Sequence, residues 1–301
     1  MIFHKYQGAG NDFLIADNRD GAIIHEDGVL KFRDNEGNEH CLEIQNICDR
    51  RYGVGADGLM LLEKSDDYDF RMVYFNSDGS GGMMCGNGGR CIVAFAADCG
   101  INNFHFEAAD GEHQAEILSY GSDGSDGSDV HFNNASKTVR LKMKDVSEFY
   151  EYQKLTGVDV PSDGYFLDTG TRHFVRLVSA LETFPVTGHG REIRYNGAEL
   201  QPFGANVNFV ELVPNGVKVR TYEKGVEDET FACGTGIVAS CLAAYVHGHR
   251  TCQGTSSERV RFEVQAKRDA LAVDFIPSAD GLSFSDIWLT GPATYVADIV
   301  Y

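Results

Sequence analysis

Short stretches of alternating apolar and polar residues dominate this chain. Gly, Asn and Asp separate them, and they cover residues 5–18, 68–79, 104–111, 138–146, 165–178, 205–213, 216–223, 259–265 and 270–276. Alternation with a period of two sends successive side chains to opposite faces of a β-strand. The pattern therefore predicts a protein built mainly from short strands.

Two Ala-rich segments, residues 86–99 and 234–247, are apolar on nearly every side and are predicted to be helices. A helix without a polar face is usually enclosed by other structure. We therefore expect two sheet-rich units, each wrapped around a buried helix. Two polar segments are expected to lie on the surface: a GSDGSDGSD loop at residues 121–129 and an excursion at residues 26–40.

Composition narrows the class of protein. The 301 residues include 45 acidic and 26 basic side chains, a net charge of −19, which argues against binding to nucleic acid or to an anionic membrane. Hydrophobic residues make up 43% of the chain, enough for a large core. The N-terminus lacks the apolar region of a signal peptide, and no apolar run is long enough to span a bilayer. We expect a cytoplasmic protein.

The eight cysteines do not form a recognisable metal or disulfide framework. No pair of CxxC motifs is present, so no metal site is predicted, and disulfides are rare in proteins without a secretory signal. Most of these thiols are expected to be small buried side chains.

Two cysteines stand in matched surroundings, because both predicted helices begin with a similar motif. Cys85-Gly86-Asn87-Gly88 is followed by Gly100, and Cys233-Gly234-Thr235-Gly236 is followed at the same offset by Gly248. Two unrelated helices with Gly in similar turns would also give this pattern. A duplication explains both copies and predicts two similar domains, each with a cysteine at a helix start.

A cysteine at a helix start is suited to acid–base chemistry. The unsatisfied N–H groups and the positive end of the helix dipole lower the pKa of a thiol there. The same N–H groups can bind a carboxylate. Two such turns could hold one carboxylate with a sulfur on each side of its α-carbon, as in a two-base racemase. That reaction needs neither a metal nor pyridoxal phosphate if the N–H groups stabilise the developing charge.

Further motifs, in their order and spacing, make the chain resemble the diaminopimelate epimerase family over nearly its full length, outside residues 26–40 and 118–136. The motifs are residues 5–13 (KYQGAGNDF), 49–58 (DRRYGVGADG), 75–80 (FNSDGS), 84–91 (MCGNGGRC), 204–209 (GANVNF), 222–225 (YEKG) and 229–236 (ETFACGTG).

The resemblance implies an α+β fold of two pseudosymmetric domains. Each would be a β-barrel-like sheet wrapped around a central helix, with the active site in the interdomain cleft. The first domain would cover residues 1–140 and regain a C-terminal strand at about residues 288–301, and the second would cover residues 141–287. Relatives also suggest a homodimer.

The resemblance further implies the cofactor-independent conversion of LL- to meso-diaminopimelate, an amino-acid substrate on the route to lysine and cell-wall peptide. Cys85 and Cys233 match the catalytic cysteines, and the direction of reaction decides which one is the base. The backbone N–H groups matched to the α-carboxylate clamp are those of Gly86, Asn87, Gly234 and Thr235. Side chains matched to other substrate contacts are Asn11, Asn76, Asn206, Glu223, Lys224, His173, Thr171 and Arg172.

Three departures from the family pattern concern the distal half of the substrate. Lys224 stands where the family usually has Arg, and a Lys ammonium cannot grip a carboxylate with two parallel hydrogen bonds. Thr171-Arg172 replaces the usual Asn-Pro or Ser-Pro before His173, so Arg172 could supply the missing cation. Gly58 replaces a Gln found in some relatives.

Other functions remain open from sequence alone. The distal changes also fit a racemase of another amino acid, such as histidine or a hydroxyproline-like substrate. A thiol hydrolase that pairs one cysteine with His173 would leave the second matched cysteine unexplained. A non-catalytic amino-acid-binding relative would have no use for two activated thiols.

Overall fold

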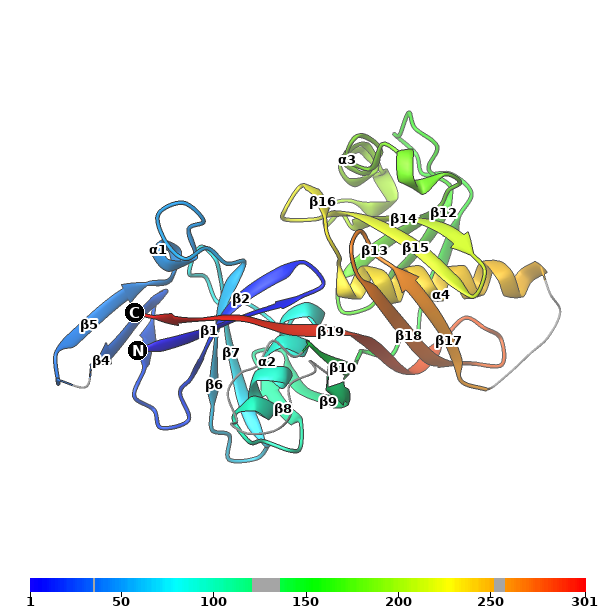
Figure 1. Ribbon diagram of the computed structural model, residues 1–301. Coiled ribbons are helices and arrows are strands. Elements are labelled where there is room, and N and C mark those ends of the chain that lie inside the picture. The colour runs from blue at the N-terminus through cyan, green and yellow to red at the C-terminus, as the bar shows by residue number, and fades with distance from the viewer. Residues whose placement is uncertain (35, 121–135, 252–257) are drawn as a thin grey trace. The chain divides into compact units, whose positions relative to one another are not determined.

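A computed structural model describes residues 1–34, 36–120, 136–251 and 258–301. The chain divides into two compact units (Figure 1). The first contains Met1–Leu141 and Gly291–Tyr301, and the second contains Lys142–Thr290. The long final strand β19 (Phe284–Val300) contributes its first half to the second unit and its last half to the first.

The first unit is built on a closed sheet of eight strands. β19 closes it, because this strand neighbours β10 and also pairs antiparallel with β1. The other strands, in sheet order, are β1 (Ile2–Gly8), β2 (Asn11–Asp17), β6 (Gly58–Glu63), β7 (Phe70–Asn76), β8 (His105–Ala108), β9 (Gly111–Tyr120) and β10 (Ser136–Lys142).

The helix α2 (Gly86–Asp98) lies in the first unit and packs against strands β1 and β2 of this sheet. Every residue from Gly86 to Ala96 is buried, as expected for a helix without a polar face. The prediction of an enclosed helix at residues 86–99 is confirmed.

The remaining strands of the same sixteen-stranded sheet lie in the second unit. Its strands, in sheet order after β19, are β18 (Ala270–Pro277), β17 (Val260–Gln265), β15 (Gly216–Glu223), β14 (Asn206–Val213), β13 (Arg172–Leu177), β12 (Gly164–Asp168) and β11 (Phe149–Tyr152), with β16 (Asp228–Thr230) beside β15. The helix α4 (Gly234–Thr251) packs on β13, β14 and β15, and α3 (Val186–Asn196) packs on β14 and β15. The predicted second helix is confirmed, but it continues through Gly248, so this glycine does not end it as the repeat suggested.

Residues 26–40, expected to be a polar surface excursion, are mostly exposed but contain regular structure that was not predicted. A small sheet forms there from β3 (Ile24–Glu26), β4 (Val29–Arg33) and β5 (Glu39–Glu43), followed by α1 (Ile44–Cys48). Leu30 and Phe32, two positions apart on β4, are buried in the core of the first unit. A period of two within a mostly polar segment was the signal for this strand. The GSD loop at residues 121–129 lies outside the described residues.

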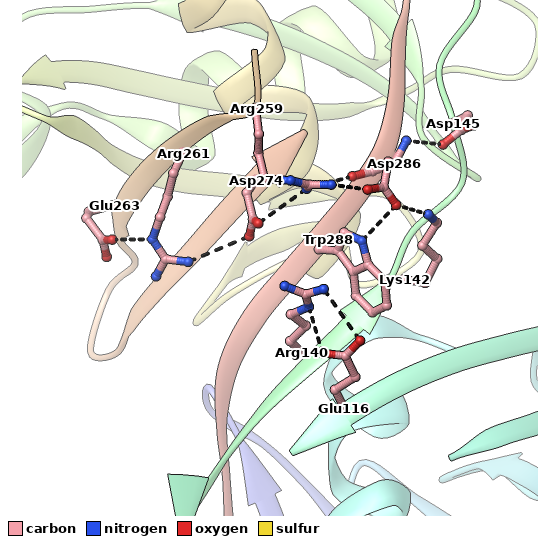
Figure 2. A network of polar contacts seen from close by, with 10 residues as sticks. All are labelled: Glu116, Arg140, Lys142, Asp145, Arg259, Arg261, Glu263, Asp274, Asp286 and Trp288. Atoms are coloured by element: carbon pink, nitrogen blue, oxygen red, sulfur yellow. Dashed lines mark hydrogen bonds and ion pairs between the residues drawn. The ribbon is translucent and has the colours of Figure 1, made fainter. Parts of the chain in front are cut away.

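A polar network joins the two ends of the second unit (Figure 2). Asp286, near the start of β19, accepts hydrogen bonds from Lys142 and Arg259 and from the Trp288 indole at 2.9 Å. Its backbone N–H donates to Asp145 at 3.0 Å. These contacts hold the segment that enters the second unit against the strand that leaves it.

The predicted combination of many short strands with a few helices is confirmed. The described residues form a mixed structure of mostly strands with four α-helices and a closed eight-stranded barrel. No helix within those residues is long and apolar enough to cross a membrane.

Candidate active site

Cys85 is the N-cap residue of α2. Its sulfur accepts a hydrogen bond from the Gly88 N–H at 3.2 Å, so the sulfur sits at the positive end of the helix. A Cβ at residue 88 would lie 3.2 Å from this sulfur and 3.5 Å from Phe13, which leaves little room for a side chain. Cys85 is partly exposed, unlike the fully buried Cys91 on the same helix.

Two predicted substrate-binding residues, Asn11 and Asn87, are joined through their side-chain amides. Asn87 Nδ2 donates to Asn11 Oδ1 at 2.6 Å, and Asn11 Nδ2 donates to Asp57 at 2.8 Å. Asn87 Oδ1 accepts from Arg90 at 2.8 Å. These hydrogen bonds run in a row from Arg90 through Asn87 and Asn11 to Asp57. The Arg90 guanidinium can only donate and the Asp57 carboxylate can only accept, so these two groups determine the orientation of both amides.

Arg90 and Asp57 were not singled out by sequence analysis. Arg90 is fully buried within the first turns of α2 and also donates to the carbonyls of Gly86, at 3.0 Å, and of Pro292, at 3.3 Å. The only available signal was an Arg inside an otherwise apolar helix. A buried guanidinium needs several acceptors, and these backbone and amide oxygens supply them.

Asn76 lies at the end of β7, opposite Gly58 of β6. Its amide donates to the Ser80 hydroxyl at 3.0 Å. A Cβ at Gly58 would overlap the Phe75 carbonyl and lie 2.5 Å from the Tyr74 ring. The Tyr74 ring therefore occupies the space that a larger residue at position 58 would need.

Cys233 directly precedes α4 and is buried. Its carbonyl accepts the N–H of Ile237 at 2.8 Å, the bond that starts the helix. Its sulfur lies 3.5 Å from the Thr235 hydroxyl. This arrangement places Cys233 at the start of an enclosed helix, as Cys85 is in the first unit.

His173 lies on β13 and is fully buried. Its Nε2 lies 2.9 Å from the Thr171 hydroxyl and 3.0 Å from the Thr235 hydroxyl. Its Nδ1 lies 3.0 Å from the amide nitrogen of Asn208, a residue that sequence analysis did not single out. Burial lowers the pKa of His173 to about 3, so the ring is neutral at physiological pH.

Asn206 is held in place by backbone groups. Its Nδ2 donates to the Arg172 carbonyl at 3.2 Å, and its Oδ1 accepts the backbone N–H of Lys224 at 2.9 Å. The side chain of Lys224 is exposed. Lys224 therefore positions Asn206 through its backbone while its ammonium group is accessible to a ligand.

Glu223 and Arg172 have separate contacts. Glu223 ends β15 and accepts from the Thr230 hydroxyl at 2.8 Å. Arg172 lies with its guanidinium carbon 4.9 Å from the centre of the Phe166 ring and 5.6 Å from that of Phe203, and it donates to the Leu200 carbonyl. These contacts hold the Arg172 guanidinium between two aromatic rings and a backbone carbonyl.

Within each unit, the structure brings most of the predicted residues together. In the first unit, Asn11 is bonded to Asn87, two residues after Cys85, and in the second a connected group is formed by Cys233, Thr235, Thr171, His173 and Asn206. Each group combines a cysteine with the N–H groups of a helix start, which suits it to bind a carboxylate and move a proton. The described residues contain no cluster of three or more His, Cys, Asp or Glu side chains able to hold a metal ion.

Solved structures with a similar fold have low sequence identity to this chain. A phenazine biosynthesis protein of the PhzF family from Bacillus anthracis matches 99% of the chain and 98% of its own, with a TM-score of 0.65 and 14% identity. A probable proline racemase from Agrobacterium radiobacter matches 100% of the chain and 92% of its own, with a TM-score of 0.61 and 14% identity.

Sequence relatives are closer. The family model described as diaminopimelate epimerase matches residues 3–132. A diaminopimelate epimerase from Flavobacterium psychrophilum is 39% identical over 299 residues, 98% of each chain. One from Chlorobaculum tepidum is 38% identical over 297 residues, 96% of each chain. The agreement extends over both units, and the chain belongs to the diaminopimelate epimerase family.

Proposed function

We propose that this chain interconverts LL- and meso-diaminopimelate through Cys85 and Cys233. The activity is that of its family, an isomerase of lysine biosynthesis that acts on an amino acid. One cysteine, as thiolate, removes the α-proton, and the other, as thiol, delivers a proton to the opposite face. The direction of reaction decides which is the base, because each direction leaves the two sulfurs with exchanged protonation states.

The observation that carries this mechanism is the matched placement of the two cysteines. Each stands at the start of an enclosed helix and is followed by Gly, and the Cys85 sulfur already accepts a helix N–H. A negative charge on such a sulfur is stabilised by the helix end. Two equivalent acid–base groups are what inversion at one carbon requires.

The first N–H groups of both helices are proposed to bind the α-carboxylate. In α2 these belong to Gly86 and Asn87, and in α4 to Gly234 and Thr235. The first N–H groups of an α-helix have no carbonyl partner within the helix. As the α-proton leaves, negative charge develops on the carboxylate, and these donors stabilise it without any cofactor.

Both cysteines must reach one α-carbon for this mechanism. We therefore propose that the first domain (residues 1–140 with about 288–301) and the second (residues 141–287) are pseudosymmetric and bind the substrate in a cleft between them. A homodimer and a cytoplasmic location remain predictions from the sequence and the family.

The remaining predicted residues are proposed to contact the rest of the substrate. Asn11, Asn76 and Asn206 offer amide groups, Glu223 offers a carboxylate for the amines, and His173 and Thr171 lie beside Thr235. Lys224 is proposed to bind the distal carboxylate. The contacts of Arg172 with Phe166 and Phe203 give less support to a role of its guanidinium in that binding.

Proton NMR in D2O tests the mechanism. LL-diaminopimelate incubated with reduced enzyme is expected to give meso product that carries deuterium at the inverted carbon, because the second thiol exchanges with solvent. Cys85→Ala and Cys233→Ala are each expected to lose this conversion by at least a thousandfold while remaining folded. Cys41→Ala, which changes an exposed cysteine, is the matched control and should keep full activity. Near-normal turnover in either site variant would disprove the two-base mechanism.

A racemase of another amino acid is the alternative, favoured by Lys224 and by the Tyr74 ring beside Gly58. It predicts α-proton exchange with a different amino acid and none with diaminopimelate in the same NMR experiment. Absence of exchange with every amino acid tested would instead favour a binding protein.

A further inference from the structure

A chain of hydrogen bonds runs from the sheet of the second unit to the Cys233 sulfur. The Thr221 hydroxyl donates to Asn208 Oδ1 at 2.8 Å, and Asn208 Nδ2 lies 3.0 Å from His173 Nδ1. On the other side of the ring, His173 Nε2 lies 3.0 Å from the Thr235 hydroxyl, which lies 3.5 Å from the sulfur. Thr221, Asn208 and His173 are all buried.

The surroundings determine how the Asn208 amide is oriented. Its nitrogen lies 3.4 Å from the Phe174 carbonyl, which can only accept. The group that faces this carbonyl must therefore be the NH2, and the oxygen must face Thr221. One amide hydrogen points to Phe174 and the other to His173.

This orientation fixes the tautomer of His173. The ring is neutral, and its Nδ1 receives an amide hydrogen, so the ring proton must be on Nε2. Nε2–H then faces two hydroxyls as possible acceptors, that of Thr171 at 2.9 Å and that of Thr235 at 3.0 Å. When Thr235 Oγ accepts the hydrogen bond from Nε2–H, its own O–H is available to point at the Cys233 sulfur.

The glycine after Thr235 maintains this geometry. A Cβ on Gly236 would overlap Asn208 Oδ1, so only glycine leaves room for the amide beside the helix start. The three side chains within hydrogen-bond distance of the His173 ring, among the described residues, are uncharged. The acidic groups on the two strands beside β13 have other contacts: Asp168 of β12 accepts the Gly170 N–H, and Glu211 of β14 accepts the Leu181 N–H.

We propose that Asn208 and Thr221 are positioning residues that hold His173 as its Nε2–H tautomer, so that Thr235 donates a hydrogen bond to the Cys233 thiolate. His173 is then a fixed hydrogen-bond donor rather than a base. The catalytic use of this thiolate rests on the proposed function, but the donor and acceptor directions of these hydrogen bonds do not.

Nitrogen NMR of the unmodified protein tests the tautomer directly. With 15N-labelled histidine, His173 is expected to show a protonated Nε2 and an unprotonated Nδ1 from pH 6 to 8, and His173→Gln identifies its signals. A protonated Nδ1 would overturn the proposal. This outcome does not depend on substrate or on turnover.

Alkylation of Cys233 tests whether these hydrogen bonds stabilise its thiolate. The rate of its reaction with iodoacetamide is measured against pH by peptide mass spectrometry, with Cys85 in the same protein as internal reference. Asn208→Leu has a similar shape but lacks the donor. It is expected to raise the pH at which the Cys233 alkylation rate is half-maximal by about one unit, because roughly tenfold less thiolate is present near neutrality. Thr221→Val should raise it by less, and Thr221→Ser, which keeps the hydroxyl, should restore it.

Ser162→Ala is the matched control, because it removes a buried hydroxyl of the second unit that makes no hydrogen bond to these residues. An unchanged Cys233 midpoint in both Asn208→Leu and Thr221→Val, or an equal shift at Cys85, would overturn the proposal. If the Cys233 midpoint shifts as expected while diaminopimelate is not epimerised, the positioning roles of Asn208 and Thr221 are supported and the proposed substrate is wrong.

Discussion

At the scale of single residues, burial decides the state of His173. Its folded pKa of about 3 lies below the usual value of about 6.5, so the unfolded chain takes up a proton first as the pH falls. The native state should therefore lose stability below pH 6.5, by up to about 1.4 kcal/mol per pH unit, until the pH nears 3. Urea unfolding at pH 4.5 to 7.5 should show a steeper pH dependence for the native protein than for His173→Gln. Parallel curves would contradict a buried neutral histidine.

Lys224 is the residue on which substrate preference is expected to depend. Its backbone N–H holds Asn206, and this bond survives a change of side chain. Lys224→Arg should therefore leave kcat within about twofold and lower KM for diaminopimelate or leave it unchanged, since Arg binds a carboxylate with two bonds. Steady-state kinetics measure both constants. A large rise in KM would indicate that the distal pocket is built around the ammonium group.

At the scale of elements, the first turn of α2 depends on Arg90. Arg90→Leu removes the donor to Asn87 and to the Gly86 and Pro292 carbonyls, leaving buried acceptors unsatisfied. We expect the free energy of unfolding to fall by about 2–4 kcal/mol. Activity should fall as well, because Asn87 loses its orientation. Urea unfolding of Arg90→Leu beside Arg51→Leu, which changes an exposed arginine, tests this, and equal stability of the two variants would refute it.

At the scale of the whole molecule, one carboxylate joins the segments that enter and leave the second unit (Figure 2). The hydrogen bond from Lys142 lowers the pKa of Asp286 to about 2. Its charge therefore stabilises the fold above about pH 4, and this contribution is lost as the pH falls through 2. Asp286→Asn tolerates the positive φ of 49° at this position but removes the charge.

Thermal unfolding should show this variant to be less stable by about 1 kcal/mol at pH 7. The difference should shrink toward pH 2. Glu263→Gln, which changes an exposed partner of Arg261, should have no measurable effect. A difference for Asp286→Asn that does not depend on pH would assign the loss to packing rather than to charge.

The sequence by itself determined the features that depend on local order. Alternating residues predicted most strands, continuous apolar stretches predicted α2 and α4, and the matched motifs placed Cys85 and Cys233 at their starts. These predictions succeed because strand and helix periodicity, and the cap of a helix, involve residues close together in the chain.

Only the tertiary structure decided which distant residues meet. Arg90 stood out only as an Arg in an apolar helix, and Asn208 was not singled out, because their roles arise from partners such as Pro292 and His173 on other elements. The sheet at residues 24–43 was missed because most of its residues are polar. Only the packing shows that Leu30 and Phe32 are buried and hold it on the core. The burial that makes His173 neutral and the contacts that turn Arg172 toward Phe166 likewise depend on packing, which no single stretch of sequence contains.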